Sequence, residues 1–302
     1  MTYLQLAAHL FLLVFWMRLW VKPEQSFSFN PFLSGTFRLG DKVVAFLRPA
    51  LGFPDRSAAF VLLAFFWIFQ AMFFIRFGKI WYLSLGMVQF IAPPKESLTW
   101  GMQFAYSGIH SAQFLIQVWT VYFFTRLIAP PNRPARAQEA FTFFMRPFSR
   151  LPLLLQPFVL LALHVALAYA VVRIGALSHI GLPRQDEVKF VSGLFTDGHV
   201  LAQLARIGMV AMMSFASGFE TLIYAIIFFI LGGLAMTLVG VQTLSLIFRE
   251  SVDVLMGRFA RNPTVTGGGF DFTPILFIFV VSFINGNMQV LLSKLLLMPL
   301  PL

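Results

Sequence analysis

The stretch FLRPALGFPDRSAAFVLL (residues 46–63) places charged residues directly beside a long apolar run. An Arg-Pro pair closes one apolar piece, and Asp55 and Ser57 open the next. A helix that starts at the headgroup level of a bilayer leaves its first N–H groups without partners, and an Asp or Ser side chain there can cap them. The stretch therefore predicts a point where the chain turns and enters a membrane as a helix.

The composition of the whole chain agrees with a membrane protein. Hydrophobic residues make up 59% of the 302 residues and charged residues 11%, and the mean hydropathy is +0.81. A soluble domain carries about 25% charged residues, so this chain must use lipid as part of its solvent. Cysteine is absent, which excludes disulfides, a thiolate nucleophile and cysteine-ligated metals.

The net charge of +10 is strongly basic. On a soluble protein this charge would suggest nucleic acid as a partner. Here the basic residues lie mostly between apolar segments, where membrane topology and contact with anionic lipid explain them. We therefore expect the lipid bilayer, and no nucleic acid, as a partner.

Apolar runs of about 18–25 residues are long enough to cross a bilayer. Such runs occupy residues 3–20, 57–77, 101–128, 151–175, 219–247 and 272–296. We read the first as a retained span, because it lacks a basic start and a small-residue cleavage site. Basic residues concentrate in the loops after the first, third and fifth runs, which the positive-inside rule places inside, with both termini outside.

Two further stretches allow more than one interpretation. Residues 78–90 look interfacial, because Trp81 and Tyr82 follow Lys79. Residues 201–217 are apolar but include Arg206, so they lie in the interface or lengthen the fifth span.

A short amphipathic piece recurs between the members of each span pair. The copies are DKVVAFLRP (41–49), EAFTFFMRP (139–147) and SVDVLMGRF (251–259). Each has an arginine at or next to its end, and each preceding span ends near an arginine. The arginine can reach lipid phosphate or pair with an acid, and Pro49 and Pro147 turn the chain out of helix.

These observations predict an all-α polytopic membrane protein with about six transmembrane helices in three helical hairpins. Amphipathic interfacial segments join the two members of each hairpin. The expected divisions are residues 1–97, 98–200 and 201–302, the second being the most degenerate copy.

Several motifs resemble the YggT (YlmG-type) family of integral membrane proteins. The first hairpin contains RLW (18–20), NPF (30–32), LRP (47–49) and DRS (55–57), and the third contains RFARNPTVTGGGFDFTPI (258–275). The family pattern would have a proline after Ser57 and an acid at the start of the fourth span, and both are absent here.

The resemblance implies a non-enzymatic protein of a bacterial inner membrane, of the kind linked to membrane-protein assembly and envelope organisation. With the repeat, it predicts a scaffold or assembly factor that contacts other membrane proteins or anionic lipid. The residues expected to make these contacts are Arg18, Asn30, Pro31, Arg48, Pro49, Asp55, Arg146, Pro147, Arg258 and Asp271.

The third predicted span offers an alternative function. Gln103, Ser107, His110, Gln113 and Gln117 recur at steps of three or four, so they share one helical face. With His164, this face could line a path for an ion or small solute in a transporter or channel, or it could hydrogen-bond to neighbouring helices. Asn285, Asn287 and Gln289 in the last span allow the same two interpretations.

Three histidines, His9, His110 and His164, lie within predicted spans. His110 and His164 could ligate haem from adjacent spans, or each could form interhelical hydrogen bonds as a neutral imidazole. We favour the hydrogen bonds and expect no cofactor, no metal and no catalytic residue, because no H-E-x-x-H motif or nucleophile elbow is present. The oligomeric state stays open.

Overall fold

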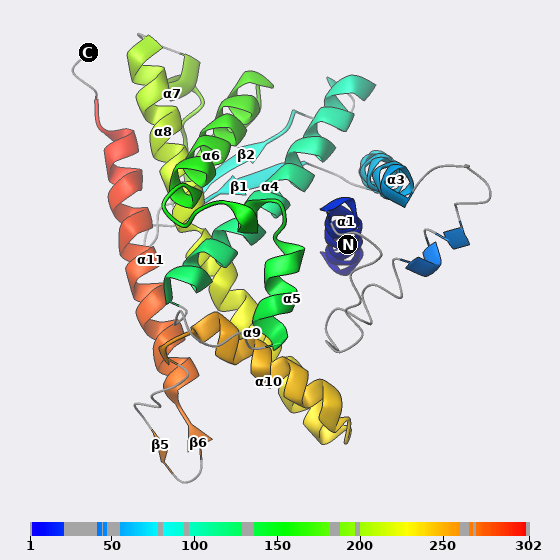
Figure 1. The fold of residues 1–302 in the computed structure, drawn as a ribbon. Coiled ribbons are helices and arrows are strands. Elements are labelled where there is room, and N and C mark those ends of the chain that lie inside the picture. Colours follow the sequence, from blue (N-terminus) through cyan, green and yellow to red (C-terminus); the bar gives the residue numbers. More distant parts are fainter. Residues whose placement is uncertain are drawn as a thin grey trace. The chain divides into compact units, whose positions relative to one another are not determined.

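The computed structural model describes residues 2–20, 41–43, 45–46, 55–77, 81–93, 97–128, 136–181, 188–196, 200–259, 266–267 and 270–299 (Figure 1). Helices dominate this part of the chain. They are α1 (Thr2–Trp20), α3 (Asp55–Phe77), α4 (Trp100–Ile128), α5 (Arg136–Phe144), α6 (Gln156–Arg173), α7 (Gly193–Thr196), α8 (Val200–Ala216), α9 (Gly218–Leu238), α10 (Gln242–Met256) and α11 (Thr273–Leu297). The strands are β1 (Tyr82–Leu85), β2 (Val88–Ile91), β3 (Leu177–Gly181), β4 (Val188–Phe190), β5 (Thr266–Gly267) and β6 (Phe270–Asp271).

Four helical stretches are long and apolar enough to cross a membrane, which makes the chain a helical integral membrane protein. They are Arg56–Phe74, Gln156–Arg173, Val200–Leu238 and Thr273–Leu297. In the first helix the apolar stretch of this kind is Phe11–Trp20, which is shorter than a span, and α4 is long but carries several polar residues. The organisation into six spans and three hairpins therefore stays a prediction.

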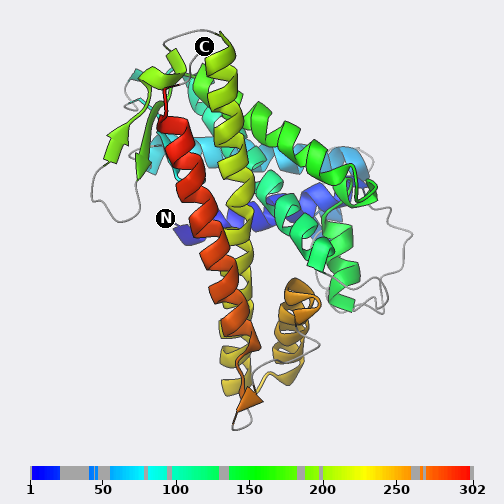
Figure 2. The ribbon, with the colours of Figure 1, turned by 90° about the vertical axis from the view of Figure 1, so that its left-hand side faces the viewer.

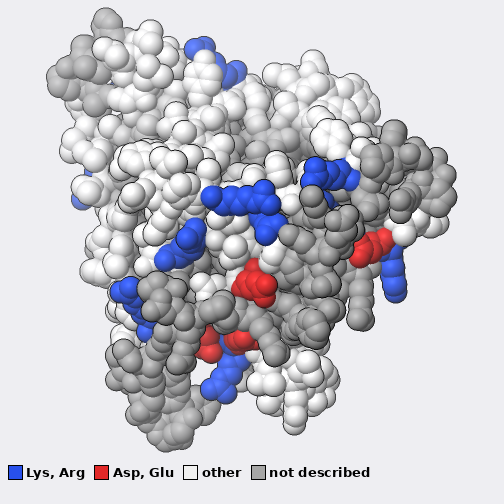
Figure 3. Space-filling model, in the orientation of Figure 1, with Lys and Arg blue, Asp and Glu red and all other residues white. Residues whose placement is uncertain are grey.

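The exposed face of α9 shows why this chain needs lipid or another apolar surface around it. Tyr224, Phe228, Leu231, Leu234 and Leu238 are all exposed, and they recur at steps of three or four, so they form one stripe along the helix. An apolar stripe of this length is unfavourable in water and suits the hydrocarbon of a bilayer. On the face of the molecule drawn in Figure 3, the Lys, Arg, Asp and Glu side chains form a few separate groups between areas of other residues.

The fifth predicted span, 219–247, is shorter in the structure. Helix α9 ends at Leu238, and the chain turns at Gly240, whose φ is +80°. The Gly240 N–H donates to the carbonyl of Thr237, and the Val241 N–H donates to that of Met236, which is the hydrogen-bond pattern of a Schellman motif. Residues 242–247 therefore belong to the next helix, α10.

Helix α10 folds back against α9 at a pair of glycines. The Thr237 and Ser245 hydroxyls are hydrogen-bonded at 2.6 Å. A Cβ atom added at Gly232 would lie 2.6 Å from Cε1 of Phe248. The absent side chain at Gly232 thus provides the space that the Phe248 ring fills.

We expect Gly232→Leu to lower the free energy of unfolding by about 1–3 kcal/mol, because overpacking forces shifts in a filled contact. Thermal unfolding of the purified protein in detergent would measure the loss. Adding Phe248→Ala should restore part of it. Gly286→Leu serves as the control, because a Cβ at Gly286 meets no atom within 4 Å. Equal losses from both leucine variants would contradict the packing role of Gly232.

The chain divides into two compact units. Unit 1 comprises residues 1–69, 122–152 and 222–278, and unit 2 comprises residues 70–121, 153–221 and 279–302. Each unit thus draws on all three predicted hairpins. The hairpin boundaries 1–97, 98–200 and 201–302 describe a repeat rather than compact bodies, and they stay a prediction.

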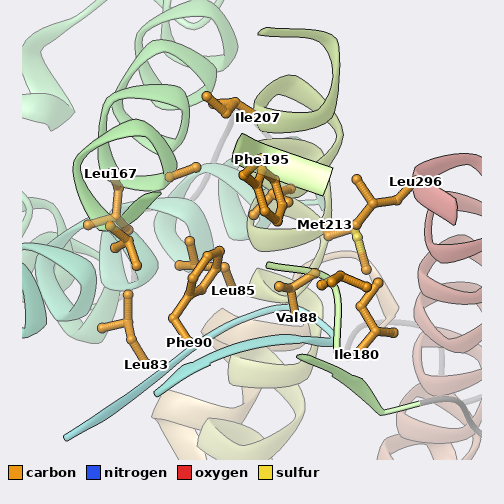
Figure 4. Close-up of a cluster of buried hydrophobic side chains, with 14 of the residues drawn as sticks. Leu83, Leu85, Val88, Phe90, Leu167, Ile180, Phe195, Ile207, Met213 and Leu296 are labelled. Atoms are coloured by element: carbon orange, nitrogen blue, oxygen red, sulfur yellow. The ribbon is translucent and has the colours of Figure 1, made fainter. Parts of the chain in front are cut away.

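Unit 2 contains a small antiparallel sheet with the strand order β1-β2-β3-β4. Alternate side chains from three strands, Leu83, Leu85, Phe90 and Ile180, are buried in one cluster. Figure 4 shows them pointing toward side chains of α6, α8 and α11. The alternation matches a sheet with one face against a core, so the strands close a hydrophobic core together with helices.

This sheet was not expected from the sequence. Residues 82–91 form a β-hairpin that turns at Gly86, whose φ is +66°, so the interfacial interpretation of 78–90 missed its strands. Residues 78–80 lie outside the described chain.

The segment 201–217 forms α8. It packs on α6 and β1, and with α9 it makes a 39-residue apolar helical stretch, Val200–Leu238, that figures as a single candidate span. Figure 2 shows these two helices following one another. The length and composition of this stretch suit a longer fifth span, and both interpretations allowed by the sequence stay predictions.

Candidate functional site

The second Arg-Pro segment, residues 139–147, lies in unit 1 and is held on several sides. Its helix α5 packs against α1 and α10. The Trp16 indole Nε1–H donates to the carbonyl of Arg146 at 2.8 Å. The N–H of Arg258, from the third segment, donates to the carbonyl of Ile128 at the end of α4 at 3.0 Å. Unit 1 thus brings together the second and third repeated segments, as well as the end of the first helix.

The Arg146 side chain is partly buried and rests on an aromatic ring. Its guanidinium carbon lies 4.0 Å from the centroid of Phe143, which is a favourable cation–π distance. Burial lowers the pKa of Arg146, and the positive charge of Arg150 lowers that pKa further. A desolvated cation beside a second cation is stabilised by an anion, so this position suits lipid phosphate or an acidic partner.

Arg18, at the end of α1, forms an ion pair with Asp41. Arg18 is buried, and Asp41 begins the first repeated piece. An ion pair therefore connects the first helix to the first amphipathic piece. The prediction of Arg18 as a contact residue placed it at the correct end of the helix, but the structure gives it a carboxylate of the same chain.

Arg126 is the corresponding residue at the end of α4, and it borders a cavity of about 210 Å³. Its guanidinium carbon lies 5.8 Å from the ring centroid of Tyr122. The cavity is lined by Tyr122, Thr125, Arg126, Gln138, Phe141, Thr142, Ser149 and Val254. Of these residues, the sequence pattern indicates Arg126, which ends the third predicted span as Arg18 ends the first. The other lining residues have no such signal in the sequence.

The remaining predicted contact residues are placed unevenly. Pro147 lies in a half-buried turn and Arg258 is exposed. Asp55 is the first residue of α3 and Asp271 the last of β6; their side chains lie outside the described structure. Asn30, Pro31, Arg48 and Pro49 lie outside the described residues. The expected set as a whole therefore stays a prediction.

The polar face of α4 lies within unit 2 and bonds to neighbouring elements. The Gln113 amide donates to the carbonyl of Ser84 on β1 at 2.5 Å. The Gln117 amide donates to the carbonyl of Ser214 and to the hydroxyl of Ser217, both at 3.0 Å. Two of the glutamines proposed for a polar path thus fasten α4 to the sheet and to the end of α8.

His164 is fully buried between two hydroxyl groups. Its Nε2 lies 3.1 Å from the Thr120 hydroxyl and its Nδ1 lies 2.9 Å from the Ser214 hydroxyl. The Thr120 hydroxyl already donates its proton to the carbonyl of Ile116 at 2.8 Å. It follows that the Nε2–H of a neutral imidazole donates to Thr120, while Nδ1 accepts a hydrogen bond from Ser214. The ring joins α4, α6 and α8.

His110 lies elsewhere in unit 2, among aromatic rings. Its ring centroid is 6.5 Å from those of Phe74 and Trp81. On α4 it is ten residues from Thr120, the partner of His164, which is about 15 Å along a helix axis. The structure therefore does not bring His110 and His164 together as haem ligation would require. Among the described residues, no group of three or more His, Cys, Asp or Glu could hold a metal ion.

A second glutamine holds the junction of α8 and α9. The Gln289 amide of α11 donates to the carbonyl of Met213 at 2.8 Å, beside the Ser214 carbonyl bound by Gln117. The Met213 carbonyl also accepts the N–H of Ser217 at 2.9 Å, so the two glutamine amides add hydrogen bonds to the last turn of α8 and stabilise this junction. Of the polar group at 285–289, Gln289 therefore packs, whereas Asn287 is exposed and bonds to its own helix.

These elements define the class of protein as a helical integral membrane protein, with hydrogen-bonded polar side chains inside unit 2 and arginines at the helix ends of unit 1. Comparisons of the chain with protein-family models, with curated protein sequences and with solved structures found no match.

Proposed function

We propose that this protein is a YggT-like, non-enzymatic scaffold or assembly factor of a bacterial inner membrane. In this role the Arg-Pro segments lie at the level of the lipid phosphates and contact other membrane proteins or anionic lipid. The apolar helices anchor the chain, and exposed stripes such as that of α9 offer a surface to a partner within the bilayer.

The observation that carries this proposal is the fixation of the second Arg-Pro segment. Its backbone is bound by Trp16, and its helix packs against α1 and α10, while the charged groups of Arg146 and Arg150 stay at the surface or partly buried. A cationic segment held in one conformation loses little entropy on binding. This arrangement favours recognition of a partner over simple anchoring.

The alternative is a transporter or channel that uses His110, Gln113, Gln117 and His164. Three of these side chains, Gln113, Gln117 and His164, are hydrogen-bonded to neighbouring elements of unit 2. A side chain that bonds to a packed backbone has to break that bond before it can bind a solute. The contacts therefore support a packing role and favour the scaffold.

Purification from native membranes in mild detergent, followed by quantitative mass spectrometry, tests the two functions. We expect a stoichiometric membrane partner whose recovery falls at least about fivefold in Arg146→Gln, which is roughly 1 kcal/mol of binding free energy. Recovery should be unchanged in Arg173→Gln, a control at the end of α6.

The double variant Gln113→Leu and Gln117→Leu addresses the transporter. Partner recovery should persist in this variant if it folds. Loss of solute flux from proteoliposomes in the folded double variant, with full tolerance of Arg146→Gln, would overturn the scaffold in favour of the transporter.

A further inference from the structure

Arg18 and Arg126, which end the first spans of the first and second predicted hairpins, have different surroundings. Arg18 is neutralised by Asp41, at the start of the first amphipathic piece. The counterpart of Asp41 in the repeat is Glu139. Yet in the described part of the chain Arg126 forms no ion pair, and it lies beside a cavity and over the Tyr122 ring. At Arg18 the chain itself thus supplies the anion, which is the carboxylate of Asp41. At Arg126 a bound ligand can supply it.

Three of the four hydroxyl groups around the cavity donate their protons within the chain. Thr125 donates to the carbonyl of Tyr122 at 2.7 Å, Thr142 to that of Gln138 at 2.8 Å, and Ser149 to that of Thr142 at 2.8 Å. Their oxygens retain lone pairs that can accept hydrogen bonds. Among the described lining residues, the hydrogen-bond donors that remain are the guanidinium of Arg126, the amide of Gln138 and the phenol hydroxyl of Tyr122.

The cavity therefore offers a cation together with a set of neutral acceptors. A phosphate oxygen suits the guanidinium, and a neighbouring hydroxyl or ammonium group suits the hydroxyl oxygens. Phe141 and Val254 add apolar wall. A volume of about 210 Å³ is smaller than the roughly 300 Å³ at which pockets for drug-sized ligands begin, so it suits a headgroup rather than a whole lipid.

We propose that this cavity binds a phosphodiester whose attached headgroup carries a hydrogen-bond donor, the chemistry of phosphatidylglycerol or phosphatidylethanolamine. Arg126 and Gln138 bind the phosphate oxygens. The oxygens of Thr125, Thr142 and Ser149 accept hydrogen bonds from the glycerol hydroxyls or the ammonium group. The site rests on the proposed function in one respect, which is that the end of α4 lies at the level of the lipid headgroups.

Native mass spectrometry of the detergent-purified full chain tests the site. The protein is titrated with phosphatidylglycerol, phosphatidylethanolamine and phosphatidylcholine, whose quaternary ammonium lacks a donor. We expect at least one of the first two lipids to bind about tenfold more tightly than phosphatidylcholine. Arg126→Gln should weaken the binding of all three lipids, because each carries the phosphate that Arg126 binds.

Arg173→Gln is a matched control, because Arg173 also ends a helix and lies 5.1 Å from the ring of a tyrosine four residues earlier, Tyr169. It should bind lipid as the unaltered chain does. Gln138→Leu keeps the charge of Arg126 and should weaken binding severalfold, which keeps the test valid if Arg126→Gln does not fold. Equal lipid binding by Arg126→Gln and Arg173→Gln, or by Gln138→Leu and the unaltered chain, would overturn the proposal.

Competition with glycerol 3-phosphate and inorganic phosphate tests whether the phosphate in the cavity belongs to a lipid or to a soluble molecule. Displacement by glycerol 3-phosphate at micromolar concentration would identify a soluble phosphate ester as the ligand, whereas resistance to it would identify the lipid. The recovery of a protein partner is measured on the same variants. A chain that loses lipid binding but keeps its partner, or the reverse, shows which of the two proposals has failed.

Discussion

Replacement of Gly86 by alanine should remove most of the folded protein from the membrane. Gly86 turns the β1–β2 hairpin at a φ of +66°, and an added Cβ would lie 2.6 Å from Oε1 of Gln289 and 2.8 Å from the carbonyl oxygen of Met213. The left-handed conformation costs a non-glycine residue about 1–2 kcal/mol. The clash with a backbone atom has no rotamer that relieves it, so the total reaches about 3–5 kcal/mol.

Substitutions at two other glycines distinguish the cost of the left-handed backbone from the cost of the clash. Gly175 has a φ of +78° but open space around it, and Gly208 lies within α8 with nothing within 4 Å. We expect Gly175→Ala to cost about 1 kcal/mol and Gly208→Ala to stabilise by up to about 1 kcal/mol. Thermal unfolding in detergent and the yield of monodisperse protein measure all three. If Gly86→Ala matched Gly175→Ala, the close approach of the hairpin to α8 and α11 would be wrong.

His164→Leu has the second largest expected effect, a loss of about 2 kcal/mol in the free energy of unfolding. The change removes the hydrogen bonds to Thr120 and Ser214, and it leaves the Ser214 hydroxyl without this acceptor in a buried site. Interhelical hydrogen bonds in membranes average about 0.6 kcal/mol, with a maximum near 1.7, and the loss of packing around a fully buried ring adds to this.

A double-mutant cycle with Ser214→Ala isolates the hydrogen bond. The two changes together should cost less than the sum of the single losses, because both remove the same contact. His179→Leu is the control, since His179 bonds to Gln89 at an exposed site of the sheet and should cost under about 0.5 kcal/mol. A stable, monodisperse His164→Leu protein with additive effects would show that the ring is not structural, and would return attention to transport.

The positions of the long helices could be predicted from the sequence. Apolar runs with charged residues at their ends predicted α3 and α11 to within a few residues, because an uninterrupted apolar run long enough for the bilayer favours a helix. The bounds of α4 were also predicted closely, although polar residues interrupt its run. The end of α9 was missed. Residues 219–247 are apolar nearly throughout, and the decisive signal is the single glycine at 240, whose backbone conformation composition does not reveal.

The strands were missed for a different reason. Leu83, Leu85, Val88 and Phe90 alternate with other residues around a glycine turn, which is a hairpin pattern. Trp81, Tyr82 and Lys79 also match the composition of a membrane interface, so the same residues fit two different structures. The pairing of β2 with β3 joins residues about ninety positions apart, and no local pattern predicts such a contact.

Like the helices and strands, the candidate sites could be predicted from the sequence only in part. The spacing of Gln113 and Gln117 predicted a shared face on α4, and the structure confirms that both point to bonded neighbours. The identity of those neighbours, a strand carbonyl and the end of α8, depends on tertiary structure. Likewise Arg126 is visible in the sequence, but its cavity exists because α5 and α10 pack beside the end of α4.

The apolar helical stretch Val200–Leu238 has a consequence for the choice of membrane. Its 39 residues correspond to about 58 Å of helix, whereas the hydrocarbon core of a bilayer is about 30 Å thick. Tilt, local thickening of lipid or burial against protein must accommodate the excess, each at a cost that depends on bilayer thickness. The junction at Ser217, which Gln117 and Gln289 stabilise from two sides, is where this mismatch can be absorbed, so acyl-chain length should bias where in a heterogeneous membrane the protein accumulates.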